Sequence, residues 1–216
     1  MGIETLLKVI MIACPTLFAI TVHEIAHGWA ANRCGDSTAR ALGRLTLNPI
    51  KHIDPLGTII LPTILYMTGG IIFGWAKPVP VNYNQLKNKR RDMALVALAG
   101  PAANLLMLLL WAMIFSSVDN QSDFAGKFIL GMAMIGMWIN TILMVLNLLP
   151  IPPLDGSQVM NQLLPKPYRD QFERIAPWGM FILIALALSG LLFEMIMPIT
   201  QSILRWVWQF FAITPN

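Results

Sequence analysis

The residues best suited to chemistry in this chain are His-Glu-Ile-Ala-His at positions 23–27. In a helix, His23 and His27 lie one turn apart on one face, so both imidazoles can bind the same metal ion. Glu24 lies about 100° around the helix, where it can reach a water on that ion without binding the ion itself. The pattern predicts a hydrolytic zinc site with Glu24 as its general base.

The motif lies inside an almost wholly apolar stretch, residues 6–31, whose one further charged side chain is Lys8. A helix of this length spans a hydrocarbon core of about 30 Å. A charged side chain at the centre of such a helix costs about 2.5–3.5 kcal/mol, so Glu24 needs a partner there. On a soluble helix, two histidines one turn apart are often surface residues. Inside an apolar helix no water can satisfy them, which favours the metal site.

The composition is that of a membrane protein. Of the 216 residues 56% are hydrophobic and 12% are charged, with a mean hydropathy of +0.63. We expect one domain over residues 1–216, with a catalytic core at about 6–160 and a helical pair at about 175–212. Two cysteines provide no disulfide framework. The net charge of +4 reflects basic loops and indicates no nucleic-acid partner.

The apolar runs predict an all-α polytopic membrane protein with five to six transmembrane helices. One further run, residues 53–75, is interrupted by two prolines and four glycines. We expect it to form a re-entrant or short β segment between the first helix and the helix that contains Gly100 and Pro101. The predicted helices are 6–31, 93–118, 127–149, 175–193 and 195–212.

Charge decides how the run 53–75 is interpreted. The loops on either side of it, 32–52 and 76–92, are both rich in lysine and arginine. A full crossing would place them on opposite sides of the membrane, against the positive-inside rule. A segment that dips in and returns leaves both in the cytoplasm. Five full spans then place the N-terminus outside and the C-terminus inside, with His23 and His27 in the cytoplasmic leaflet.

A catalytic zinc site usually has three protein ligands and a water. The candidates for the third ligand are Asp155, His52, Asp54 and, weakly, Glu173. Asp155 is favoured because it closes the predicted helix 127–149, which ends at the same depth as the motif. Three prolines between positions 150 and 153 break that helix, and Gly156 lets the chain turn the carboxylate inward.

Several motifs occur in a fixed order along residues 20–160. They are His23-Glu24-x-x-His27, Asn48-Pro49-x-x-His52-x-Asp54-Pro55-x-Gly57, Gly74-Trp75-Ala-Lys-Pro78-Val-Pro80-Val-Asn82, Gly100-Pro101-Ala-Ala-Asn104, and Asn147-x-x-Pro150 followed by Leu154-Asp155-Gly156. Together they resemble the site-2 protease family of intramembrane zinc metalloproteases, in its short bacterial and archaeal form without PDZ or CBS modules.

The resemblance implies that His23, His27 and Asp155 hold one Zn²⁺ and that Glu24 is the general base. It also implies peptide hydrolysis in transmembrane protein substrates within a lipid bilayer, in a bacterial or archaeal cell membrane. The chemistry needs only these parts: the metal activates water and polarises the carbonyl, and Glu24 transfers the proton.

Four further polar residues are candidates for a role near the site. Asn147 could bind substrate backbone or brace the turn at Asp155, or it could only pack between helices. Asn104 is expected to be a buried hydrogen-bonding residue. His52 and Asp54 could support the site or deliver water, or they could form a capped turn before the run 53–75.

Residues 77–82 suggest how a substrate could be held. Pro78 and Pro80 remove amide donors from one edge of an extended strand and leave the other edge, with Val79 and Val81, free to pair. A helical substrate must be unwound before hydrolysis, and strand addition would hold it. A rigid proline-rich connector is the alternative.

A membrane metal-ion transporter or sensor could use the same His and Asp cluster. Transport favours ionisable residues placed across the whole bilayer and internal repeats. Here these residues concentrate at one depth and no repeat is evident, so the sequence favours the protease.

Overall fold

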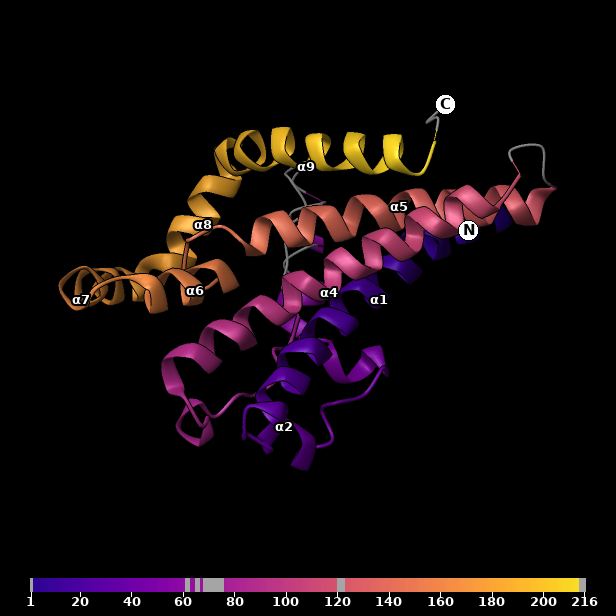
Figure 1. The fold of residues 1–216 in the computed structure, drawn as a ribbon. Coiled ribbons are helices and arrows are strands. Elements are labelled where there is room, and N and C mark those ends of the chain that lie inside the picture. The colour runs from indigo at the N-terminus through magenta and orange to yellow at the C-terminus, as the bar shows by residue number, and fades with distance from the viewer. Residues whose placement is uncertain (1, 61–62, 65–66, 68–75, 120–122, 214–216) are drawn as a thin grey trace.

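Three long helices form the body of the molecule in the computed structural model, which describes residues 2–60, 63–64, 67, 76–119 and 123–213. They are α1 (Ile3–Arg33), α4 (Lys89–Ser117) and α5 (Phe124–Asn147). They lie side by side along most of their length (Figure 1). All three are long and apolar enough to cross a membrane.

Side-chain caps define where two of these helices begin. The Asn88 side chain accepts a hydrogen bond from the amide of Arg91 at the start of α4. Asp123 does the same for the amide of Gly126 at the start of α5. Each cap satisfies a donor that the first turn of a helix leaves without a partner.

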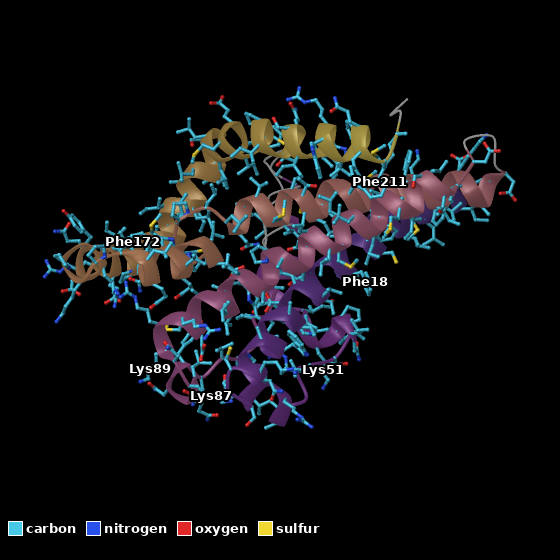
Figure 2. All side chains as sticks on the ribbon, viewed as in Figure 1. Phe18, Lys51, Lys87, Lys89, Phe172 and Phe211 are labelled. Atoms are coloured by element: carbon cyan, nitrogen blue, oxygen red, sulfur yellow. The ribbon has the colours of Figure 1, made fainter. Side chains whose placement is uncertain are left out.

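The two basic loops lie together at one end of this bundle. Their short elements are α2 (Thr38–Ala41), η1 (Pro49–His52) and η3 (Tyr83–Gln85). The Lys77 amide donates to the His52 carbonyl at 2.9 Å, and the Lys87 amide donates to the Cys34 carbonyl at 3.0 Å. Figure 2 shows Lys51 from the first loop at the same end as Lys87 and Lys89 from the second. The described residues that flank the 53–75 run, His52 and Lys77, therefore lie at the same end of the bundle.

Much of the 53–75 run, residues 61–62, 65–66 and 68–75, lies outside the described residues. The start of the run forms the one-turn π-helix η2 (Pro55–Ile60). No β-strand occurs in the ranges that the structure describes, and residues 76–82 have no regular secondary structure. The short β segment is therefore not seen in the described part of the connection.

The C-terminal part differs from the expected pair of helices at 175–193 and 195–212. It contains α6 (Asp155–Leu163), α7 (Lys166–Ile175), η4 (Ala176–Trp178), α8 (Gly179–Leu188) and α9 (Leu191–Phe210). The fourth segment that qualifies as a candidate span, after α1, α4 and α5, is Lys166–Leu188, which joins α7 to α8. α9 does not qualify.

The packing of α9 corrects the predicted direction of the last helix. Leu192 and Ile196 near its start pack with Met144 and Val145 near the end of α5. Leu204 and Val207 pack further back along the bundle, with Leu108, Ala112 and Met137. α9 is thus antiparallel to α5, and Arg205 lies away from the basic loops. The physical reason is that the ten residues of α8 rise only about 15 Å, so α8 does not carry the chain across the bundle.

Candidate metal centre

Three side chains from two distant parts of the chain meet between α1 and α6. The Nε2 atoms of His23 and His27 lie 3.0 Å apart, and each lies 3.3 Å from Oδ2 of Asp155. Zinc with bonds of about 2.0–2.2 Å holds tetrahedral ligands at about 3.3 Å from one another. The described residues contain one such group of potential metal ligands, and its spacing fits zinc.

The hydrogen bonds of the two imidazoles fix their tautomers. His27 Nδ1 lies 2.7 Å from the Val96 carbonyl, which can only accept, so this nitrogen carries the proton. His23 Nδ1 lies 2.6 Å from the Asn104 side-chain oxygen, which makes it a donor as well. In the neutral rings both Nε2 atoms then present lone pairs. Three lone-pair atoms that converge require a cation between them, and this donor set suits zinc.

Asp155 reaches the histidines because it is the first residue of α6. The α5 helix ends at Asn147, and a proline-containing connection returns the chain to the same depth. Gly156 lies directly against the Leu148 and Leu149 backbone, where a side chain would not fit. Oδ2 of Asp155 is buried, and no hydrogen-bond donor contacts it within the described ranges. An atom in this position is suited to bind a metal.

Gly100 on α4 lies directly against the imidazole rings of His23 and His27. A Cβ atom at this position would overlap ring atoms of both His23 and His27. The glycine lets α4 approach α1 closely enough for Val96 and Asn104, which flank it on α4, to bind the two Nδ1 atoms. Gly100 therefore allows the close approach of α4 and also lies in direct contact with the two predicted histidine ligands.

Glu24 follows His23 and points to residues 77–82. Its Oε2 accepts a hydrogen bond of 2.8 Å from the backbone amide of Val79. Its Oε1 makes no hydrogen bond within the described part of the chain. This leaves one carboxylate oxygen for a water at the metal centre.

The other candidates for the third ligand lie elsewhere. The Nε2 of buried His52 faces the Thr46 carbonyl at 3.0 Å. Asp54 accepts from the amides of Leu56 and Gly57, which makes it the cap of η2. Glu173 accepts from the Asn161 side chain on the molecular surface. Asp54 thus caps the turn at the start of the run 53–75, and His52 lies buried just before it.

Asn104 and Asn147 have different surroundings. Asn104 is fully buried and joins His23 to Asn140, whose side-chain oxygen accepts from the Asn104 amide at 3.0 Å. Asn147 donates to the Leu143 carbonyl of its own helix at 3.0 Å. Asn104 therefore contacts a predicted metal ligand directly, whereas Asn147 only borders the turn that leads to Asp155.

Two residues near the site were missed in the sequence. Asn140 lies in an apolar helix, and a polar residue in such a helix is itself a signal of a buried network. Tyr83 follows the 77–82 segment. Burial raises the pKa of its hydroxyl, and the negative charge of Asp155 raises it further. Tyr83 thus lies within the electrostatic reach of the metal centre, which no local sequence pattern shows.

Comparison with known proteins places this centre in a family. The model of Peptidase family M50 matches residues 118–189, which include Asp155. The chain is 36% identical to YwhC of Bacillus subtilis, named as a zinc metalloprotease, over 179 residues that cover 81% of this chain and 78% of the relative. The chain belongs to peptidase family M50.

A second relative agrees. Rip2 of Mycolicibacterium smegmatis, also named as a zinc metalloprotease, is 31% identical over 192 residues, which cover 87% of this chain and 71% of the relative. No solved structure matches the chain. The resemblance to the site-2 protease family is confirmed, and so is the prediction of a zinc metalloprotease.

Proposed function

We propose that this M50 metalloprotease is an endopeptidase that cuts membrane-spanning proteins within the bilayer. The observation that carries the proposal is the position of the His23, His27 and Asp155 cluster. Two of its members belong to α1, a helix of 31 residues that is apolar enough to span a membrane. A protease centre built into such a helix meets substrates that are themselves in the membrane.

The proposed roles follow from the contacts. His23, His27 and Asp155 hold zinc through Nε2, Nε2 and Oδ2, and Val96 and Asn104 orient the rings. Zinc in this site would lower the pKa of a water and polarise the scissile carbonyl. Glu24 takes the proton from the attacking water at its Oε1 and delivers it to the leaving amine.

The segment 77–82 is proposed to hold the unwound substrate. The Val79 amide, expected to be free, is bound to Glu24. The Val79 carbonyl and both backbone polar groups of Val81 make no hydrogen bond within the described residues. In an extended chain, the backbone groups of residues 79 and 81 point to the same side. These groups are the ones left to pair with a substrate strand beside Glu24.

The proposed site faces the cytoplasmic leaflet. His23 and His27 lie in the last third of α1, towards the end that carries Lys51, Lys87 and Lys89 (Figure 2). Basic loops favour the cytoplasmic side of a membrane. Water reaches a centre at this depth through a short path, and the protein is proposed to be a multi-pass protein of a bacterial or archaeal membrane.

A metal transporter or sensor is disfavoured by the same geometry. Ion transport requires ligand groups at successive depths. The described residues hold a single group of three potential metal ligands. Glu24, which is outside that group, has a clear use in hydrolysis.

The proposal is tested with purified protein, zinc and a synthetic, internally quenched transmembrane peptide in detergent micelles. The wild-type protein should cleave the peptide, and Glu24→Gln should lose cleavage by a factor of roughly 10²–10⁴ while it retains its zinc. Thr16→Val on the same helix is the control, because the Thr16 hydroxyl donates to the Ile12 carbonyl of its own helix. Equal cleavage by the Glu24→Gln protein would contradict the assigned base.

A further inference from the structure

Residues 77–82 are fixed beside Glu24 by groups from the loop that follows α1. The Lys77 amide donates to the His52 carbonyl, and Arg44 donates to the carbonyls of Lys77 and Pro78 at 3.1 and 3.3 Å. At the other end, the Asn82 amide donates to Oδ2 of Asp36 at 2.6 Å. The segment is thus held on both sides of Val79, the residue that contacts Glu24.

Asp36 is the most deeply buried member of this set. It lies three residues beyond the end of α1 and has no exposed surface. Its Oδ1 accepts hydrogen bonds from the amide and the hydroxyl of Thr38, while its Oδ2 is bound to the Asn82 amide. A buried carboxylate with three donors is firmly held. Asp36 therefore joins the end of the helix that carries Glu24 to the segment that contacts Glu24.

The side chain of Val79 shows how closely the segment docks on α1. Val79 is 6% exposed, and a Cβ atom at Gly28 would come within 2.8 Å of its Cγ1. Gly28 lies one turn beyond Glu24 on α1. The segment therefore rests on the helix directly beside the glutamate, and a small shift of the segment would move the Val79 amide away from the carboxylate.

We propose that Asp36 is a positioning residue for catalysis, which acts through the 77–82 segment. By holding the Asn82 amide, Asp36 keeps the Val79 N–H on Oε2 of Glu24, and this bond fixes the rotamer that turns Oε1 to the water. The inference rests on the proposed role of Glu24. We call the hydrogen bond between Asp36 and the Asn82 amide the brace. A base that is misplaced by about 1 Å costs up to roughly a hundredfold in rate, so loss of the brace should lower kcat measurably.

Asp36→Asn isolates the brace. The asparagine keeps one oxygen that can accept from Thr38, but its NH₂ group faces the Asn82 amide, and two donors repel each other. Asp123→Asn is the matched control, since Asp123 also accepts a backbone amide through its side chain but caps α5 in the loop after α4. Zinc content, kcat and KM are measured for the wild type and both variants with the quenched transmembrane peptide.

We expect Asp36→Asn to lower kcat roughly tenfold, with KM within about twofold of wild type and one zinc retained per chain. Asp123→Asn should leave all three quantities unchanged. A kcat for Asp36→Asn within twofold of wild type would overturn the inference, and so would an activity loss that merely follows lost zinc. Cleavage by the wild type and its loss in Glu24→Gln test the proposed function separately from this brace.

Arg44→Gln provides a second test that does not disturb the buried carboxylate. Arg44 holds the same segment at Lys77 and Pro78 from a more exposed position. Arg44→Gln should also lower kcat, as Asp36→Asn does, while the protein retains its zinc. If Asp36→Asn cannot be isolated folded, this variant decides, and an unchanged kcat for Arg44→Gln then rejects the inference.

Discussion

The Nδ1 atom of His23 lies 2.6 Å from the side-chain oxygen of Asn104, which the chain reaches 81 residues later. The Asn104 amide in turn donates to Asn140, and Asn140 donates to the Gly136 carbonyl at 2.8 Å. One imidazole of the metal centre is thus oriented by a chain of hydrogen bonds that passes through all three long helices. Buried networks of this kind hold ligands only when every member is satisfied.

Replacement of Asn104 tests this network. Asn104→Leu keeps the number and branching of the side-chain heavy atoms but removes the acceptor of the His23 Nδ1 proton, so the ring loses its fixed orientation. We expect zinc to bind roughly 10–100-fold more weakly. Competition with a fluorescent zinc chelator measures the change. An unchanged zinc affinity would show that Asn104 only fills space between the helices.

Gly100 allows a sharper steric test. In Gly100→Ala the new methyl group would overlap both imidazole rings, and the rings must move apart to admit it. Zinc affinity should fall by at least roughly tenfold, because the two imidazole nitrogens can no longer both lie at bonding distance from one ion.

Gly131→Ala is the control for that substitution. Gly131 also lies in a long helix, but the atoms near its added methyl group belong to the flexible Met11 side chain, which can move. Zinc binding by Gly131→Ala should equal that of the wild type. Equal zinc affinity in both alanine variants would contradict the contact between Gly100 and the two rings.

The pH dependence of stability should reveal the contribution of ionised Asp36 to the stability of the folded protein. Burial alone would raise the pKa of this carboxyl, but hydrogen bonds from Thr38 and Asn82 outweigh burial and hold it below the ordinary value of 3.8. The unfolded chain therefore binds the proton more readily than the folded protein. The stabilisation is fully present at pH values well above the ordinary pKa of 3.8 and is lost as the pH falls through the lower folded value.

The difference in thermal midpoint between the wild type and Asp36→Asn, measured from about pH 3 to pH 6, isolates this effect. The difference should be largest at the upper end of the range and should shrink at the lower end. A difference that stays constant with pH would show that ionised Asp36 does not contribute to stability.

The sequence predicted the parts of the centre that depend on local spacing. His23, Glu24 and His27 are fixed by helix periodicity, and Asp155 could be inferred because two helices end at one depth. The partners that orient these residues could not be predicted in the same way. The Val96 carbonyl and the Val79 amide are backbone groups, which every residue type has, so no residue pattern marks them.

The C-terminal helices show a second limit. Hydropathy indicates two apolar runs, but it does not tell whether each run crosses the membrane. The decisive feature is the short α8, followed by Gly190 in the left-handed conformation with φ of 80°. This turn lets α9 start beside the end of α5 and run antiparallel to it. A glycine in an apolar sequence does not by itself predict that reversal.

X-ray absorption at the zinc edge on the purified protein tests the joint binding of one ion by His23, His27 and Asp155 most directly. The wild type should show one zinc per chain with only nitrogen and oxygen ligands at about 2.0–2.2 Å, two of them imidazoles. Asp155→Ala should lose zinc or change this shell. A wild-type shell containing sulfur from Cys14 or Cys34, or an unaltered zinc shell and content in Asp155→Ala, would contradict the metal centre described for this protein.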